Sequence, residues 1–328
     1  MFRTIAILGG TGSLGHALTA FLLRETTATI RILSRDEAKQ DTMAQTFAAH
    51  AERLRFLLGD IRDPSRLIVA LRNVDLVVHA AALKRIPQGE HDPLEFVQTN
   101  IMGTSNVLYA CIYNGVHTAV FVSSDKACLP VNLYGQTKAV GERLWLQGNS
   151  YAPEGTRFVA LRYGNVGGSR GSVIPYWQSQ LAAGLPLSLT DPGMSRFYLS
   201  LDEAVSYAWH TACHVPRGCL FVPHLPAFLL TDLMRAVAPD AYARITGIRP
   251  GEKLAEALMT DDERQRARPV IDADGRTFGY LIPPAVRSWA LDETLLPPEA
   301  VKPLEHYVSD TWSWRLGVDD LRMRLKEG

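Results

Sequence analysis

The sequence predicts an α/β protein built on a doubly wound parallel sheet, with a smaller α/β lobe toward the C-terminus. Strand-like and helix-like segments alternate through residues 1–165, which is typical of a parallel sheet flanked by helices. A glycine-rich turn links the first strand to the first helix. Beyond residue 165 the order is less regular, and glycine and proline interrupt it. We therefore expect one domain over residues 1–165 and a lobe mainly over residues 166–328, with some later segments returning to the first domain.

Short apolar runs rich in β-branched residues predict the strands, and longer amphipathic segments predict the helices. The predicted strands are residues 4–8, 28–33, 54–58, 74–80, 117–122 and 158–161. The predicted helices of the first domain are residues 14–24, 36–50, 93–114 and 131–147. In the lobe we expect helices at residues 201–214 and 231–238, and a charged loop at residues 262–275.

Composition describes an ordinary globular protein, with 34 basic and 34 acidic residues and 47% hydrophobic residues. A chain without net charge gives no reason to expect nucleic acid or an anionic membrane as a partner. No window approaches the roughly 20 apolar residues that a membrane span requires. The N-terminal apolar stretch is also too short for a secretory signal. We therefore expect a soluble cytoplasmic protein.

The four cysteines are Cys111, Cys128, Cys213 and Cys219. They form no CxxC pair and have no metal-ligand spacing with histidine, so the sequence predicts no metal site. Free buried thiols in a reducing cytoplasm are the preferred interpretation, with disulfides as the alternative.

A glycine triplet lies at the first turn of the chain. Gly9, Gly12 and Gly15 follow the spacing G-x-x-G-x-x-G, after the first predicted strand and at the start of the first helix. Glycine lets a pyrophosphate approach the backbone, and the helix N-terminus presents unpaired amides to its charge. This context favours a dinucleotide-binding Rossmann fold over a plain strand-to-helix turn. The residues expected to contact the cofactor here are Gly9, Thr11, Gly12, Ser13, Leu14 and Gly15.

The end of the second strand is expected to select the cofactor. An NAD site usually places an acidic residue there for the ribose hydroxyls, whereas this chain continues Ser34-Arg35-Asp36. Arg35, with Ser34 and Lys39 within reach, could hold a 2′-phosphate through charge-assisted hydrogen bonds. We therefore predict NADP. Asp36 could still bind a ribose, which keeps NAD as the alternative.

Further cofactor contacts are expected where other strands end, because the carboxyl ends of parallel strands face the ligand crevice. Small residues after the fourth strand would let the cofactor lie against the backbone, with buried alanines in a helix–sheet contact as the alternative. His79 is interpreted as a core histidine. The residues expected at these strand ends are Asp60, Ile61, Ala80, Ala81 and Ala82.

Tyr134 and Lys138 are four residues apart on the helix after the fifth strand, so they lie on one face of it. A nearby ammonium and the charge of an oxidised nicotinamide both favour the phenolate. We therefore expect the pKa of Tyr134 to fall below its usual value of about 10, which would make it a base for a substrate hydroxyl. Chance YxxxK pairs are common, but this one follows the loop Ser123-Ser124-Asp125-Lys126.

The turn at residues 9–15, the pair Ser123-Ser124 and the motif Tyr134-x-x-x-Lys138 together resemble the extended short-chain dehydrogenase/reductase superfamily. The strings at residues 124–127 and 132–135 are similar to those of UDP-N-acetylglucosamine 4,6-dehydratases of the C5-inverting type, which serve pseudaminic-acid and related glycan pathways. Supporting matches lie at residues 34–37, 81–84, 162–166, 168–173, 195–197 and 249–253. The resemblance covers essentially the whole chain, more loosely over residues 269–303.

The resemblance implies a dehydration in linked steps. Tyr134 takes the 4-OH proton while hydride leaves C4 for NADP⁺, and hydride later returns to C6, so no second redox substrate is needed. Between these steps Lys126 takes the C5 proton and Asp125 protonates the departing 6-OH. Asp125 must then be protonated and Lys126 neutral, and we expect burial to favour that form. The alternative for this pair is an exposed loop ion pair of little energetic value.

The resemblance also implies a stereochemical outcome and a set of ligand contacts. Retaining relatives typically have glutamate where this chain has Lys126, so the lysine predicts inversion at C5. The implied substrate-binding residues are Lys84, Ser124, Asn165, Val166, Val173, Arg196, Arg249 and Glu252. The further implied cofactor contacts are Lys84, Val122, Ser123, Tyr134 and Lys138. The expected partners are a UDP-sugar and further copies of this chain in a homo-oligomer.

Some positions depart from the family pattern or do not decide between a contact and a structural role. Gly167 stands where the resemblance leads us to expect a second valine, which would loosen the loop near the nicotinamide. Arg170 fits a solvated loop as well as a ligand contact. Trp312 and Trp314 replace a more polar run and are interpreted as core or as a subunit contact.

Two other functions stay open. A nucleotide-sugar epimerase would use the same cofactor site and the same Tyr134–Lys138 pair, with Asp125 and Lys126 serving isomerisation. A non-catalytic NADP-sensing protein would be expected to lose at least one of these four residues. All four are present, which favours an enzyme.

Overall fold

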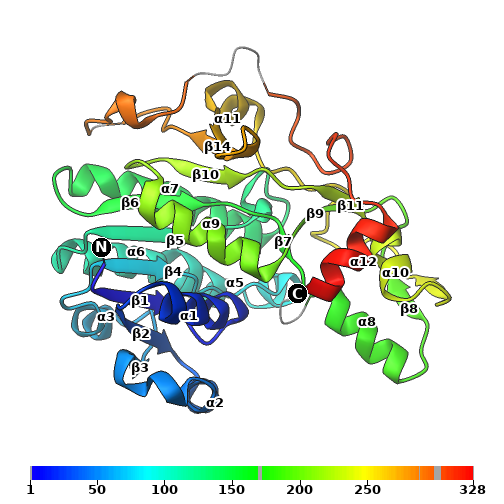
Figure 1. Ribbon diagram of the computed structural model, residues 1–328, viewed down its shortest axis with the longest axis horizontal. Helices are drawn as coiled ribbons and strands as arrows, with labels where there is room; N and C mark the ends of the chain where they lie inside the picture. Colours follow the sequence, from blue (N-terminus) through cyan, green and yellow to red (C-terminus); the bar gives the residue numbers. More distant parts are fainter. Residues whose placement is uncertain (1, 169–171, 288, 299–303, 328) are drawn as a thin grey trace.

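The computed structural model describes residues 2–168, 172–287, 289–298 and 304–327. Its centre is a nine-stranded sheet in the order β13-β14-β10-β6-β5-β4-β1-β2-β3 (Figure 1). The strands of the first domain are β1 (Thr4–Leu8), β2 (Thr29–Ser34), β3 (Leu54–Leu58), β4 (Leu76–His79), β5 (Thr118–Val122) and β6 (Arg157–Leu161). All six were expected within a few residues of these bounds, and they pair in parallel.

The direction of strand order reverses at β1. Ile7 pairs with Ile32 of β2 on one side and with Val78 of β4 on the other. Because β1 and β4 are parallel neighbours, the loops that follow them leave the sheet side by side. This is the switch point where open α/β sheets bind their ligands.

Two layers of helices cover the sheet. Helices α1 and α9 pack together, and α6 packs with both α3 and α7. The helices of the sheet domain are α1 (Ser13–Glu25), α2 (Glu37–Thr46), α3 (Pro64–Ala70), α4 (Ile86–His91), α5 (Pro93–Phe96), α6 (Gly103–Tyr113), α7 (Leu133–Tyr151) and α9 (Leu201–His214). A turn of π-helix at Val97–Met102 joins α5 to α6, so the single helix expected at residues 93–114 is three consecutive pieces.

Three strands from the second half of the chain extend the sheet. β10 (Leu220–Pro223) pairs in parallel with β6, and β14 (Thr277–Ile282) and β13 (Arg268–Ile271) follow in antiparallel pairing. The loop predicted at residues 262–275 is therefore wrong, because it holds β13 and most of helix α11 (Asp261–Arg266). A reciprocal cap between Thr260 and Glu263 starts α11, so charged residues that looked like a solvated loop begin a helix.

The remaining elements form a lobe on one side of the sheet, at the right of Figure 1. Its strands are β7 (Asn165–Val166), β8 (Leu187–Leu189), β9 (Ser195–Leu199), β11 (Ala227–Leu229) and β12 (Ala243–Ile245). Its helices are α8 (Val173–Ala182), α10 (Leu230–Val237) and α12 (Val318–Glu327). They enclose a separate apolar cluster that includes Trp177, Phe228 and Leu321. The helix expected at residues 231–238 is α10, in the lobe as predicted. The helix expected at residues 201–214 is α9, which packs with α1 on the sheet instead.

Trp312 is buried in the main core, and Trp314 stacks on His224 with ring centroids 5.0 Å apart. The core interpretation of these tryptophans is therefore confirmed for Trp312. All four cysteines are free. Within the described ranges, no helix is both long and apolar enough to cross a bilayer. The same residues contain no group of three His, Cys, Asp or Glu side chains arranged to hold a metal ion.

Candidate functional site

The glycine-rich turn lies against the backbone that follows β4. Gly9 has a φ of +77°, which favours glycine, and a methyl group there would lie 2.8 Å from Cα of Ala81. Gly12 is the N-cap of α1 and has no side chain to cover the first amides of the helix. Thr11 completes the turn, and Ser13, Leu14 and Gly15 form the first turn of α1. The six predicted loop residues therefore surround a helix N-terminus at the switch point.

The four residues predicted to select the cofactor differ in their surroundings. Ser34 is buried, and its Oγ accepts a hydrogen bond from Nε2 of Gln40 at 3.1 Å. Asp36 caps α2 by accepting from the Lys39 amide at 3.0 Å, and it also pairs with the Lys39 ammonium. Arg35 lies 3.5 Å from Asp60 and leaves 47% of its side chain exposed. Arg35 and Lys39 therefore both expose their charges to solvent, but Lys39 is paired with Asp36, and Ser34 and Asp36 take part in local structure.

The residues after β3 and β4 are held by contacts that the sequence did not reveal. Asp60 accepts hydrogen bonds from Arg62, and Ile61 is buried. Ala80 and Ala81 pack on the core, Ala82 is half-buried and Lys84 is exposed. Asn100, in the π-helical turn, accepts from the Leu83 amide at 2.8 Å and donates to its carbonyl at 2.9 Å. This paired contact fixes the segment that faces the glycine turn.

His79 is a core histidine, as expected. It is fully buried, and burial lowers its pKa to about 3. Its Nε2 lies 3.0 Å from Oγ1 of Thr104, whose hydroxyl donates to the Asn100 carbonyl. Nε2 must therefore carry the ring proton.

The loop between β5 and α7 brings Asp125 and Lys126 into a buried position. Ser123 donates its amide to Leu161, and the Val122 carbonyl accepts from Lys138. Asp125 is 1% exposed, and its Oδ1 lies 3.1 Å from Nζ of Lys126. The exposed ion pair considered as an alternative is therefore wrong.

Asp125 also contacts Ser124, whose hydroxyl donates to the same Oδ1 at 2.8 Å. The other oxygen of Asp125, Oδ2, has no hydrogen-bond partner among the described residues. A buried carboxylate oxygen without a partner is costly, so it marks a position where function outweighs stability.

Lys126 has a second carboxylate neighbour that sequence reasoning missed. Oε1 of Glu256, a residue that is 3% exposed, lies 3.5 Å from Nζ of Lys126. Burial acts to lower the pKa of Lys126, but Asp125 and Glu256 outweigh it and raise that pKa. The expectation that burial favours neutral Lys126 is therefore wrong for the protein without ligand. Glu256 lies 130 positions along the chain from Lys126, and no local signal pairs them.

Tyr134 and Lys138 lie on one helix face, but their electrostatics differ from expectation. Burial raises the pKa of Tyr134, while Lys126 and a hydrogen bond with Ser124 act to lower it. Lys138 donates to the Val122 carbonyl at 2.7 Å, its Nζ lies 3.9 Å from the Phe121 ring centroid, and burial lowers its pKa to about 7. The ammonium that favours the phenolate is thus Lys126, and the predicted fall in the pKa of Tyr134 is wrong for the protein without cofactor.

The loop that carries Asp125 and Lys126 packs closely on α7 and on a distant segment. A methyl group at Gly135 would collide with the Lys126 carbonyl. Asn132 caps α7 by accepting from the Gly135 amide at 2.7 Å and donates to the Gly251 carbonyl at 2.7 Å. Residues 249–256 are therefore fastened to the loop that carries Asp125 and Lys126.

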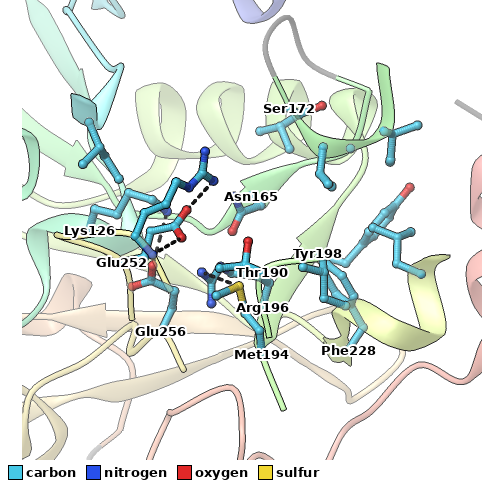
Figure 2. Close-up of a pocket in the computed structure, with 18 of the residues that line it drawn as sticks. Lys126, Asn165, Ser172, Thr190, Met194, Arg196, Tyr198, Phe228, Glu252 and Glu256 are labelled. Carbon is cyan, nitrogen blue, oxygen red and sulfur yellow. Dashed lines mark hydrogen bonds and ion pairs between the residues drawn. The ribbon is translucent and has the colours of Figure 1, made fainter. Parts of the chain in front are cut away.

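A cavity of about 210 Å³ lies between this loop and the lobe. Figure 2 shows Lys126, Glu252 and Glu256 together at one side, Arg196 and Asn165 in the middle, and Tyr198 and Phe228 at the other side. Six of the predicted substrate-binding residues line it, namely Asn165, Val166, Val173, Arg196, Arg249 and Glu252. Of the four predicted catalytic residues, Lys126 alone is on the described lining.

Several lining residues were not predicted. The unpredicted members are Ile86, Gly167, Ser172, Ile174, Thr190, Met194, Tyr198, Gly251, Phe228, Leu230, Leu233 and Glu256. Gly167 has a steric reason, because a methyl group there would lie 2.8 Å from Oη of Tyr198. The predicted residues Lys84 and Ser124 are not on the described lining. Arg170 lies outside the described residues.

Curated relatives match most of the chain. It is 44% identical over 264 residues to the UDP-N-acetylglucosamine 4,6-dehydratase (inverting) of Campylobacter jejuni, which is 80% of this chain and 78% of the relative. It is also 37% identical over 292 residues to the UDP-glucose 4-epimerase of Rickettsia akari, or 85% of each protein.

Solved structures share the fold. Pen from Bacillus thuringiensis superimposes with a TM-score of 0.89 at 32% identity, covering 99% of this chain and 98% of Pen. The dTDP-glucose 4,6-dehydratase DesIV of Streptomyces venezuelae, solved with NAD and TYD bound, gives a TM-score of 0.69 at 23% identity, covering 83% and 94%. Residues 5–273 match the family described as "Polysaccharide biosynthesis protein". The chain therefore belongs to the polysaccharide biosynthesis protein family, with the inverting UDP-N-acetylglucosamine 4,6-dehydratases among its relatives.

Proposed function

We propose that the protein is a nucleotide-sugar 4,6-dehydratase that converts UDP-N-acetylglucosamine to a UDP-4-keto-6-deoxy-hexose with inversion at C5. The observation that carries this proposal is the buried Asp125–Lys126 pair, whose lysine lines the cavity while Asp125 contacts Ser124 beside Tyr134. An acid and a base held side by side suit the removal of a proton and a hydroxyl from neighbouring carbons. The 44% identical C. jejuni relative bears the matching name.

The cofactor site fits a nicotinamide dinucleotide. The turn at Gly9 leaves no room for a side chain, and α1 presents its first amides there, as pyrophosphate binding requires. NADP is the proposed form, supported by the exposed Arg35 guanidinium, which suits a 2′-phosphate. The remaining proposed contacts are Thr11, Ser13, Leu14, Gly15, Ser34, Asp36, Lys39, Asp60, Ile61, Ala80, Ala81, Ala82, Lys84, Val122 and Ser123.

The chain's own residues account for the two protons removed from the sugar and for the proton that the leaving hydroxyl gains. NADP, when bound, supplies a hydride acceptor for C4 and a hydride donor for C6. Tyr134 removes the 4-OH proton, and the C4 ketone then acidifies the hydrogen at C5. Lys126 removes that hydrogen as a proton, and Asp125 protonates the 6-OH, which leaves as water. A proton then returns to C5 on the opposite face, which gives the inverted product.

The cavity residues are proposed to hold the UDP-sugar. Arg196 and Arg249 suit diphosphate oxygens, and Glu252 suits a pair of ribose hydroxyls. Asn165, Val166 and Val173 line the same cavity. In this assignment residues 1–165 hold the cofactor and residues 166–328 mainly hold the sugar nucleotide. A homo-oligomer and a cytoplasmic location stay predictions.

Mass spectrometry of the product tests the proposal. Purified protein with NADP and UDP-N-acetylglucosamine is expected to give a product lighter by one water. A product of unchanged mass would instead support a nucleotide-sugar epimerase, the second candidate, which the similarity to the R. akari enzyme favours. No product from any UDP-sugar would contradict both.

A further inference from the structure

Lys126 is held between two carboxylates, and only one of them has a role in the proposed reaction. Nζ lies 3.1 Å from Oδ1 of Asp125 and 3.5 Å from Oε1 of Glu256. Glu256 is 3% exposed and lines the cavity beside Lys126 (Figure 2). A buried carboxylate that faces a ligand cavity is expensive to desolvate, so its position calls for an explanation.

The backbone of Glu256 is fixed on both sides. Its amide donates to Oγ of Ser309 at 2.9 Å, and its carbonyl accepts from the Ser309 amide at 2.9 Å. Oγ of Ser309 lies in turn 2.8 Å from Oγ of Ser195 on β9. The backbone of Glu256 is thus tied to Ser309 and, through Ser309, to β9.

A second lysine contacts the other carboxylate oxygen of Glu256. Nζ of Lys253 lies 3.5 Å from Oε2 of Glu256 and donates to the Cys128 carbonyl at 2.7 Å. Lys253 therefore fastens Glu256 to the loop that follows Lys126. The charged or titratable groups that act on Lys126 are Asp125 from its own loop, Tyr134 from α7, Arg196 from β9 and Glu256 from the segment 249–256.

The proposed reaction requires Nζ of Lys126 to stay in place, and Asp125 cannot hold it at every stage. A lysine side chain is flexible, and proton transfer from carbon requires the base to stay within contact distance of C5. Asp125 carries a proton in the reactive form, so its attraction for Lys126 is weakest when the transfer occurs. Glu256 donates no proton to the leaving hydroxyl, so its contact with Nζ of Lys126 does not change in that step.

We propose that Glu256 is a positioning residue that holds Nζ of Lys126 in place for the proton transfer at C5. This inference rests on the proposed function. It assigns Glu256 no proton of its own in the reaction. Its effect should be largest on the C5 step, where Lys126 must contact the reacting hydrogen, because at C4 Lys126 acts on Tyr134 only through its charge.

The test compares Glu256→Gln with Glu252→Gln, a matched change four residues earlier on the same cavity wall. We expect Glu256→Gln to lower kcat by about 10- to 100-fold with KM within about twofold. In single turnover, reduced nicotinamide should accumulate, because the C5 step is slowed more than the oxidation at C4. Glu252→Gln should raise KM without that accumulation. An unchanged kcat in Glu256→Gln, or a first hydride transfer slowed as much as the C5 step, would overturn the proposal.

A second readout needs no sugar substrate and separates this inference from the proposed function. The rate at which acetic anhydride acylates Lys126, followed by peptide mass spectrometry across pH, reports how firmly the ammonium is held. Removing the Glu256 charge should move this profile to lower pH, whereas Glu252→Gln should not. An unmoved profile in Glu256→Gln would overturn the inference, even if the wild-type protein dehydrates the sugar. A profile that moves to lower pH would support the inference that Glu256 holds Lys126, even if the wild-type protein does not dehydrate the sugar.

Discussion

Two buried groups of charged side chains in the described part of the chain differ in how completely their polar atoms are paired. The closed cluster consists of Arg162, Glu142 and Glu263, and the open cluster consists of Asp125, Lys126, Glu256 and Lys253. In the closed cluster Arg162 donates twice to Glu142, twice to Glu263 and once to the Leu258 carbonyl, which uses all five guanidinium N–H groups. The closed cluster joins the segment after β6 to α7 and α11.

The open cluster is less completely paired. Oδ2 of Asp125 lacks a hydrogen-bond partner among the described residues, and both ion pairs of Glu256 are 3.5 Å long. Lys126 and Glu256 line the cavity, whereas the members of the closed cluster are absent from its described lining. This difference indicates that a buried charged cluster whose polar atoms are all paired has a structural role. Incomplete pairing beside a cavity indicates groups kept ready for a ligand.

The largest expected effect comes from changing the acid of the open cluster. Asp125→Asn can still accept hydrogen bonds from Ser124 and Lys126 but cannot supply a proton. We expect kcat for dehydration to fall by about 10²- to 10⁴-fold, with the unfolding temperature changed by less than about 3 °C. Steady-state kinetics and thermal denaturation check both. A large loss of stability would contradict the functional role of this cluster.

The next largest effect is the reverse experiment on the closed cluster. Arg162→Leu leaves Glu142 and Glu263 buried without their cation, which is expected to destabilise the fold by about 3–5 kcal/mol. Thermal denaturation measures this loss. If this variant keeps its unfolding temperature but loses activity, the division between the clusters is wrong.

A smaller effect is expected at Arg35, an exposed cation with one long contact. Arg35→Ala should weaken NADP binding by roughly 10-fold or more, because a charge-assisted contact to the 2′-phosphate is lost. NAD binding should stay unchanged, since NAD has no such phosphate. Titration of both cofactors by calorimetry measures the two affinities. Equal weakening of both would contradict NADP as the preferred cofactor.

The smallest effect is a pH dependence of the closed cluster. Burial acts to raise the pKa of Glu263, but Arg162 and the Thr260 cap outweigh it and hold that pKa below its usual value. A carboxylate with a depressed pKa stabilises the fold above its ordinary pKa, and this stabilisation is lost as the pH falls through the lowered value. The stability difference between wild type and Glu263→Gln should therefore shrink on acidification. A constant difference would contradict this assignment.

The sequence predicted those parts of the site whose residues are close together in the chain. Gly9 to Gly15 carry their signal within a single turn, and Tyr134 and Lys138 carry theirs within a single helix. Asp125 and Lys126 are adjacent, but their role came from the family resemblance. The cavity residues 165, 166, 196, 249 and 252 were found only through the family resemblance. Their spacing alone does not bring them together.

The parts that could not be predicted depend on contacts across the fold. Glu256 reaches Lys126 from 130 positions away, and Glu263 reaches Arg162 from 101 positions away. The charged residues around Glu263 therefore suggested a loop, although Glu263 helps to cap the start of α11. The pKa directions expected for Lys126 and Tyr134 were wrong for the protein without ligand. That of Lys126 depends on Asp125 and on the distant Glu256, and that of Tyr134 depends on burial.

The most direct test of the account is the fate of the hydrogen at C5. Wild-type protein is incubated with UDP-N-acetylglucosamine in deuterated water, and the product is analysed by NMR. In the proposed reaction Lys126 removes the C5 proton and a solvent-derived proton returns on the other face, so we expect a 6-deoxy product with deuterium at C5 and inverted configuration there. A product that keeps its original C5 hydrogen would contradict the role assigned to the open cluster.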